Sequence, residues 1–390
     1  MSESKDLYTN SSDAENSYDL YSVASGVPRT GYAIKKAKRI RRIINTIASI
    51  VLAISVLLTG VMGAFLYISG KKLGGLKADD NPQDGYEQLY ISDSPDVTYM
   101  LVAGVDLGER LTDIIVVVCF DHKNNTISCL QIPRDTFVDY ELKTYRINSV
   151  YGQTRKGESG INVLRRKLSS HFGIPIDHYV IFTIEGFMNV VDAVGGVQIN
   201  ITQKEGIEIE NQHNIGEMYT IGPGWVTLDG NAAAGFVRKR KGGESGYSKG
   251  DISRLEAQRL MYVALVKKLK EMGFGQLGSV AKSCYNEIAT DLTVNQIIGY
   301  AREAKSVDFS NFSVFTVPGQ GCTYKGYSLY SIHKQAYVDM FNEHFNPYGE
   351  QLTTDDIKVV ELHTDLGIKT GSSLASQGGS LQQIIDDKNQ

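Results

Sequence analysis

Several arginines gather in residues 228–259, where an apolar stretch, a glycine-rich loop and the start of a helix follow one another. Arg238 and Arg240 flank Lys239, so an extended backbone would project both guanidinium groups from one face, with the lysine opposite. Guanidinium forks match the geometry of phosphate oxygens. This pattern predicts a binding site for a dianionic or trianionic phosphate group, and a solvated basic loop is the alternative.

The helix that follows the glycine-rich loop adds two more polar side chains. Ser253 and Glu256 have the S-x-x-E spacing of a capping box, with Asp251 as a second candidate for the N-cap. Arg254 and Gln258 are four residues apart and share one face of the helix. Because the N-terminus of a helix favours anions, we expect these two side chains to contact the same phosphate.

A short connection between two apolar runs, residues 97–103 and 114–120, carries Asp106, Arg110 and Asp113. Open α/β sheets place ligand-binding groups in connections of this kind. Two carboxylates on one loop can hold a Mg²⁺ ion that also contacts a substrate phosphate. The connection therefore predicts a Mg²⁺ site at Asp106 and Asp113, and a salt-bridged surface turn is the alternative.

A further cation follows the next apolar run, residues 126–132. Pro133 ends this predicted strand because proline cannot continue an internal ladder. Arg134 and Asp135 then emerge at the strand end. Asn148 is of a type that could orient Arg134 or cap a turn.

Apolar patterns between these motifs predict an α/β arrangement of strands and helices that would position the polar groups. The predicted strands are residues 97–103, 114–120, 126–132, 177–184 and 312–317, and the predicted helices are residues 161–172, 186–194, 290–305 and 332–344.

Two of the predicted elements carry side chains with an uncertain environment. The helix at 161–172 is amphipathic, and its three basic side chains, Arg165, Arg166 and Lys167, are expected on a solvated face. A second group of residues forms an apolar stripe, which consists of Phe182, Ile184, Phe187, Val190 and Val191. This stripe would suit a groove for a long hydrocarbon chain, but we favour an ordinary core.

The cysteines show no spacing typical of a metal site. Cys119 and Cys129 lie in neighbouring apolar runs joined by a short turn, so a cross-strand disulfide is one possibility. Buried reduced thiols are the interpretation that we favour.

An apolar run without any charge, residues 43–68, is long enough to cross a hydrocarbon core of about 30 Å. Six basic residues precede the run and two lysines closely follow it, which predicts a single-pass anchor with a cytoplasmic N-terminus and an outer domain. A cleaved signal peptide would have a shorter apolar region. The net charge of −4 argues against general nucleic-acid binding.

Composition divides the rest of the chain around this run. Residues 371–383 are rich in Ser, Gly and Gln, and apolar periodicity is lost from about residue 346. We therefore predict a cytoplasmic tail at 1–42, a transmembrane helix at 43–68, a linker at 69–94, an outer domain at 95–345 and a flexible tail at 346–390.

In their order and spacing, the motifs resemble the LytR-CpsA-Psr family, phosphotransferases of the Gram-positive envelope. The resemblance covers about residues 95–345. It rests on GVD at 104–106, R-x-x-D at 110–113, IPRD at 132–135, DHYV at 177–180, VDAVGGV at 191–197, VRKR at 237–240 and GDxxR at 250–254.

This resemblance implies a three-layer α/β/α sandwich with a central mixed sheet, preceded by the single transmembrane helix. It implies an enzyme that moves a phosphoglycan from a polyprenyl-pyrophosphate carrier in the bilayer to peptidoglycan, with Mg²⁺ held by Asp106 and Asp113. The side chains that would bind the pyrophosphate are Arg110, Arg134, Arg238, Arg240, Arg254 and Gln258.

Two departures from the family pattern bear on these roles. Arg110 stands one residue farther from Asp113 than in the usual R-x-D, and the family's R-x-x-R-Q-Q has Ala257 in place of its second arginine.

In phosphoryl transfer Arg134 would neutralise developing charge, and either Asp113 or Asp135 would act as the base for the attacking hydroxyl. A polyprenyl-pyrophosphate hydrolase and a non-catalytic lipid-binding regulator are the alternative functions.

Overall fold

The structure of the protein is a computed structural model, and all residues that it describes belong to one unit within Ile47–Gln390. Among them, no helix is long and apolar enough to cross a membrane. The predicted cytoplasmic tail and anchor, nearly all of the linker, and Arg240 lie outside the described residues. Those described are 92, 94–138, 145–153, 158–239, 251–273, 287–368 and 378–389.

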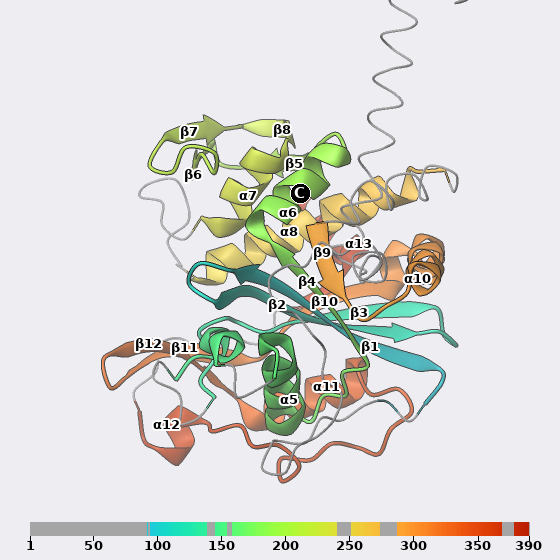
Figure 1. Ribbon diagram of the computed structural model, residues 1–390, viewed down its shortest axis with the longest axis vertical. Coiled ribbons are helices and arrows are strands. Elements are labelled where there is room, and N and C mark those ends of the chain that lie inside the picture. The colour runs from blue at the N-terminus through green and yellow to red at the C-terminus, as the bar shows by residue number, and fades with distance from the viewer. Residues whose placement is uncertain are drawn as a thin grey trace, which may run out of the picture. The chain divides into compact units, whose positions relative to one another are not determined.

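A seven-stranded mixed sheet forms the centre of the described part of the chain (Figure 1). Its strand order is β13-β10-β3-β2-β1-β4-β9, with β1 parallel to β4, β3 parallel to β10, and the other neighbours antiparallel. The strands are β1 (Val97–Asp106), β2 (Leu111–Asp121), β3 (Thr126–Gln131), β4 (His178–Thr183), β9 (Ile288–Thr290), β10 (Phe312–Thr316) and β13 (Gly378–Ser380). The predicted mixed sheet is confirmed.

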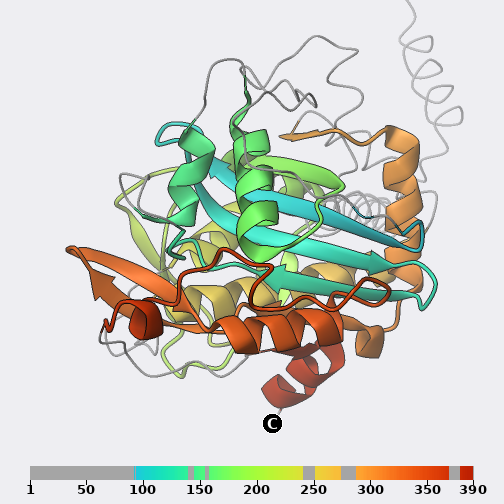
Figure 2. The same ribbon diagram turned by 90° about the horizontal axis from the view of Figure 1, so that it is seen from below.

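Successive side chains of a buried strand point to opposite sides of the sheet, so both faces of this sheet are apolar. Helices cover both faces. In β1, Met100 and Val102 join one apolar core while Leu101 and Ala103 join the other. The first face packs against α6 (Ile184–Ala193), α7 (Gly230–Arg238) and α8 (Asp251–Lys270). The second packs against η1 (Ile147–Gly152), α5 (Gly160–Phe172) and α11 (Lys334–His344), which lie in front of the sheet in Figure 2.

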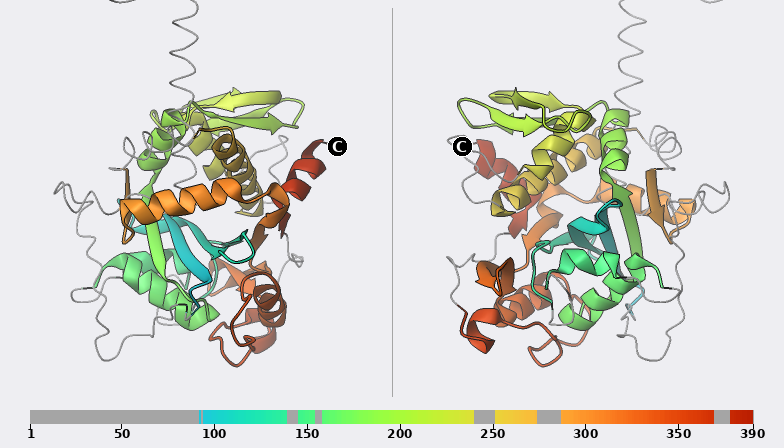
Figure 3. Two further views of the ribbon diagram at one scale, coloured as in Figure 1. Left: turned by 90° about the vertical axis from the view of Figure 1, so that its right-hand side faces the viewer. Right: turned by 60° about the vertical axis from the view of Figure 1, so that its left-hand side comes forward.

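The remaining elements lie around these helices and the sheet. Figure 3 shows the sheet and the helices that cover it from two further sides. Three antiparallel two-stranded sheets are β5 (Val197–Ile201) with β8 (Gly224–Leu228), β6 (Ile207–Glu210) with β7 (Met218–Ile221), and β11 (Gly319–Tyr324) with β12 (Tyr327–Ile332). The other helices are α10 (Val294–Ser306), η3 (Phe309–Asn311), α12 (Leu362–Asp365) and α13 (Leu381–Asn389). The helices predicted at 290–305 and 332–344 therefore begin later, because Thr290 and Ile332 belong to strands.

The predicted flexible tail is wrong for the parts of it that the structure describes. Ile357, Val359 and Leu362 are buried, and β13 pairs antiparallel with β10. These apolar residues are too irregularly spaced to produce a helical or strand period in the sequence. The chain after residue 346 nevertheless contributes to the core.

The basic residues of α5 are also not where the sequence placed them. Arg165, Arg166 and Lys167 are all buried. The Nη2 group of Arg165 donates to the carbonyl oxygens of Ile176 and Asp177, at 3.1 and 3.2 Å. The solvated-face prediction failed because the chain that follows α5 folds back over its polar side.

The two cysteines of the neighbouring strands are buried thiols, as favoured above. Cys119 points into the core beneath α5 and α11, whereas Cys129 points into the core beneath α8. Opposite faces of one sheet cannot be bridged by a disulfide. Burial raises the pKa of both thiols.

Candidate active site

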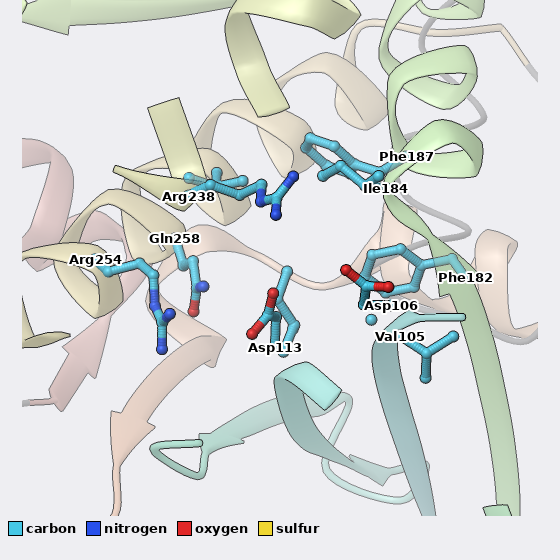
Figure 4. Close-up of a pocket in the computed structure, with 12 residues that line it drawn as sticks. Val105, Asp106, Asp113, Phe182, Ile184, Phe187, Arg238, Arg254 and Gln258 are labelled. Carbon is cyan, nitrogen blue, oxygen red and sulfur yellow. The ribbon is translucent and has the colours of Figure 1, made fainter. Parts of the chain in front are cut away.

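A cavity opens where β1 ends and β2 begins, beneath the ends of α7 and α8 (Figure 4). It encloses about 550 Å³ of space, including its open mouth. Its lining combines carboxylates, guanidinium groups, an amide and apolar side chains. The lining residues are Gly104, Val105, Asp106, Asp113, Ile114, Phe182, Ile184, Phe187, Val237, Arg238, Arg254 and Gln258.

Asp106 is positioned by the tight turn that connects β1 to β2. Its Oδ1 atom accepts hydrogen bonds from the backbone N–H groups of Gly108 and Glu109, at 2.8 and 3.1 Å. An aspartate that binds the backbone two residues ahead is a common way to build such a turn. The turn therefore fixes the carboxylate of Asp106 at the edge of the cavity.

Arg110 follows this turn but does not line the cavity. It is exposed, and its backbone adopts a left-handed conformation with φ of 55°. Its carbonyl oxygen lies so close to Gly152 that a Cβ atom there would be 2.8 Å away. The turn thus packs against η1, and Arg110 is not among the residues that line the cavity.

Asp113 lines the cavity from β2 and forms an ion pair with Arg134. The Nη1 atom of Arg134 donates to Asp113 Oδ1 at 2.5 Å, and the Arg134 side chain is 10% exposed. Asn148 contacts Arg134 through the backbone, since its N–H donates to the Arg134 carbonyl oxygen at 3.1 Å. The carboxylate of Asp113 in the cavity is therefore paired with the buried guanidinium group of Arg134.

Asp135 has a different environment from Asp113. Its Oδ1 atom lies 3.3 Å from Arg146 Nε and 3.8 Å from Arg134 Nε, and it is not among the residues that line the cavity. The sequence left these two aspartates as alternative bases. The geometry favours Asp113, while Arg146, which the sequence analysis did not single out, holds Asp135.

Arg238 reaches the cavity from the last residue of a helix, so it does not have the extended backbone that was considered for Arg238 to Arg240. The segment is rich in alanine and has Asp229 as its N-cap, whose side chain accepts from Ala232 N–H at 2.8 Å. Arg238 donates to Gln212 Oε1 at 2.7 Å, and Lys239 donates to the Glu208 carbonyl oxygen.

Arg254 and Gln258 line the same cavity from one face of α8, as their spacing predicted. Both are buried, with 2% and 4% of their surface exposed. The helix begins at Asp251, two residues before the predicted cap at Ser253. Figure 4 shows the guanidinium groups of Arg238 and Arg254 and the carboxylates of Asp106 and Asp113 around one space.

A small apolar chamber adjoins the charged cavity and shares five of its lining residues, and it encloses about 390 Å³ of space when the space open to solvent is included. It lies between the sheet and helices α7 and α8, and is lined by Val102, Ile114, Val116, Phe182, Phe187, Val237, Gln258, Met261, Tyr262 and Leu265. All of these side chains except Gln258 and Tyr262 are hydrocarbon or thioether. The site is therefore amphiphilic, with charged groups at the mouth and hydrocarbon beyond.

The apolar stripe noted in the sequence divides between core and cavity. Val190 and Val191 are fully buried, as the favoured interpretation expected. Phe182 and Phe187 are buried core residues as well, but together with Ile184 they also line the charged cavity, and the two phenylalanines line the chamber. Periodicity alone could not separate the two outcomes, because a chamber wall and a packed core need the same residue types.

Fold and cavity together describe an α/β protein whose charged cavity at the strand ends continues into an apolar chamber. The family model described as the LytR_cpsA_psr family matches residues 64–346, well over half of the chain. The protein belongs to this family.

Relatives and solved structures agree with that membership. TagU of Bacillus mycoides (strain KBAB4), a polyisoprenyl-teichoic acid–peptidoglycan teichoic acid transferase, is 28% identical over 248 residues, 62% of this chain and 75% of the relative. TagV of B. subtilis matches with a TM-score of 0.54 at 19% identity, covering 66% of this chain and 100% of TagV. TagT bound to LI-WTA matches with a TM-score of 0.53 at 22% identity, covering 65% and 90%. At these identities the two structures establish the fold.

Proposed function

We propose that this protein is an envelope phosphotransferase that moves a phosphoglycan from a polyprenyl-pyrophosphate carrier to a hydroxyl group of peptidoglycan. The observation that carries the proposal is the amphiphilic site, in which guanidinium and carboxylate groups border a cavity adjoining an apolar chamber. The transferase name of the TagU relative supports the same reaction.

The two parts of the site match the two parts of such a carrier. Arg238, Arg254 and Gln258 line the cavity, where they would bind pyrophosphate oxygens. The polyprenyl chain adjacent to the pyrophosphate would enter the chamber, where burial of its hydrocarbon surface stabilises the complex by about 25 cal/mol per Å². A soluble anion would leave that apolar chamber unused.

The carboxylates fit a Mg²⁺ site by their chemistry. Mg²⁺ prefers oxygen ligands and is commonly held by one or two carboxylates together with substrate phosphates. Asp106 and Asp113 border the same cavity as the guanidinium groups, so they would hold the ion next to the pyrophosphate. When bound there, the ion would supply neutralisation of phosphate charge.

Asp113 is the base that we assign to the acceptor hydroxyl. The hydroxyl oxygen forms a bond to the phosphorus nearest the sugar, its proton passes to Asp113, and the bond to the bridging oxygen between the phosphates breaks. The polyprenyl monophosphate departs with that oxygen. Arg134, ion-paired with Asp113 at 2.5 Å, would hold this carboxylate in place for the proton transfer.

The decisive experiment supplies the full-length chain with Mg²⁺, a polyprenyl-pyrophosphate oligosaccharide and nascent peptidoglycan. We expect glycan attached to peptidoglycan through a phosphodiester and polyprenyl monophosphate in equal amount. Free glycan phosphate with abundant acceptor would identify a hydrolase instead. Tight carrier binding without any product would identify a lipid-binding regulator.

We also propose that residues 43–68 anchor the catalytic domain on the outer side of the membrane. The support is the basic block that precedes this apolar run. Protease added to intact protoplasts should remove the domain while an epitope within residues 1–42 stays protected. The reverse pattern would place the site on the wrong side for a peptidoglycan acceptor.

A further inference from the structure

A cluster of two histidines and a glutamate lies away from the candidate active site, where α11 and α12 begin (Figure 1). His333 is the N-cap of α11, Glu361 is the N-cap of α12, and His363 lies within α12. In the part of the chain that the structure describes, no other three His, Cys, Asp or Glu side chains bring ligand atoms within 4.8 Å of one another. None of the three lines the charged cavity.

Both imidazoles converge on one carboxylate oxygen. His333 Nδ1 lies 3.1 Å from Glu361 Oε1, and His363 Nε2 lies 2.9 Å from the same atom. A tetrahedral zinc ion with ligands at 2.0–2.1 Å places its ligand atoms roughly 3.3 Å apart. A shift of a few tenths of an ångström would therefore suffice for each of these two pairs to hold an ion.

The backbone that carries these side chains is well fixed. Leu362, between two of the ligands, is fully buried, and its N–H donates to Ser331 Oγ at 2.9 Å. The Glu361 N–H donates to Asp365 Oδ2 at 2.8 Å, and Glu361 Oε2 accepts from the Lys334 N–H at 3.3 Å. The remaining oxygen, Oε1, is the one that the imidazoles approach.

The composition of the cluster selects among metals. Two imidazole nitrogens and one carboxylate oxygen suit Zn²⁺, whereas Mg²⁺ and Ca²⁺ prefer oxygen ligands alone. With neutral imidazoles the cluster carries one negative charge, and the neighbouring Lys334 and Asp365 offset each other at 3.5 Å. The three ligand side chains are 17–25% exposed, so an ion can enter from solvent.

We propose that His333, Glu361 and His363 bind Zn²⁺, with water in the fourth position, and that the ion ties the segment after α11 to the start of that helix. The ion would join two parts of the chain separated by the whole of α11 and the segment that follows it. Such a crosslink stabilises the folded state, because metal binding is coupled to folding. This site is independent of the proposed transferase chemistry.

The test uses the full-length chain, purified in mild detergent and stripped of metal, with Zn²⁺ as the ligand and Co²⁺ as a spectroscopic probe. We expect one equivalent to bind, Co²⁺ to show the visible absorption of a tetrahedral complex, and Zn²⁺ to raise Tm. Glu361→Gln and His363→Ala should each weaken binding by at least about tenfold. Glu361→Gln keeps an acceptor oxygen for Lys334, and an unchanged Tm in chelator will verify that each variant folds.

The matched controls are His213→Ala, an exposed histidine next to β6, and Asp113→Asn in the charged cavity. Both should bind Zn²⁺ like the wild-type chain. Equal affinity in the wild-type chain and in Glu361→Gln, or no Zn²⁺ binding by the wild-type chain, would overturn the proposal. Loss of binding in Asp113→Asn would also overturn it, because it would move the ion to the cavity.

Discussion

Arg165 and Arg254 lie on opposite sides of the sheet and are equally hidden from solvent, with 4% and 2% of their surface exposed. Arg165 donates to two backbone carbonyl oxygens and lies over the ring of Tyr179. Arg254 lines a cavity that also contains two carboxylates and a second arginine. Burial of an arginine therefore does not indicate a binding function by itself. The informative property is whether the guanidinium group faces a cavity or is bound by the protein's own backbone.

The comparison makes its strongest prediction for a carboxylate of the cavity. Asp113→Asn keeps the size of the side chain but removes the base and a metal ligand. We expect Mg²⁺-dependent transfer to fall about 10²–10⁴-fold, with carrier binding little changed. Asp135→Asn is the matched control, since Asp135 lies outside the cavity lining, and an equal loss in both variants would refute the choice of Asp113.

The cavity arginines should affect binding of the carrier. Arg238→Ala and Arg254→Ala each remove charge-assisted hydrogen bonds, so we expect carrier binding to weaken by about 1.5–3 kcal/mol. Arg302→Ala, at an exposed position of α10, is the control and should bind normally. Equal weakening by all three, measured by titration of the carrier, would point to a diffuse electrostatic field instead of a site.

Arg165 should behave in the opposite way to the cavity arginines. Arg165→Ala leaves the carbonyl oxygens of Ile176 and Asp177 without this donor, so we expect the free energy of unfolding to fall by about 1–3 kcal/mol. Transfer activity per folded molecule should stay unchanged. Denaturant unfolding measures the first quantity, and an activity loss without destabilisation would break the distinction between the two faces.

The smallest expected effect concerns His122, which follows the last residue of β2. A hydrogen bond to Glu303, at 2.6 Å, raises the pKa of His122 above its ordinary value. A raised pKa in the folded state gives stability that is full below the ordinary value of about 6.5 and is lost as the pH rises through the folded-state pKa. We expect a loss on the order of 0.5–1 kcal/mol in unfolding measurements between pH 6 and 8. His122→Asn should abolish this dependence without altering activity.

The polar residues that line the cavity were predictable because they occur in compact motifs. Asp106 and Asp113 flank one turn, and Arg254 and Gln258 share one helical face, so local geometry suffices to bring each pair together. The strands were predictable because they are strongly apolar, whereas the mixed sheet was implied by the family resemblance. Arg240 remains a prediction, because it lies outside the described residues.

Two of the failures have a different cause. Arg165 is buried by residues 176–177, and the chamber forms only where β4, α7 and α8 meet, so neither can be read from a local pattern. Residues 235–238 belong to a helix, which Asp229 as the N-cap and the alanines that follow it favour. Here the capping signal was the better guide.

The short strand β13 has a consequence for the ways in which copies of this chain can meet. It covers the outer edge of β10, whose backbone groups would otherwise be open to pairing with another molecule. Its first residue must be small, since a Cβ atom on Gly378 would lie 2.1 Å from the ring of Phe315. A chain that stopped before this glycine would expose the edge of β10 as a template for intermolecular strand pairing, so the last residues protect the protein from aggregation.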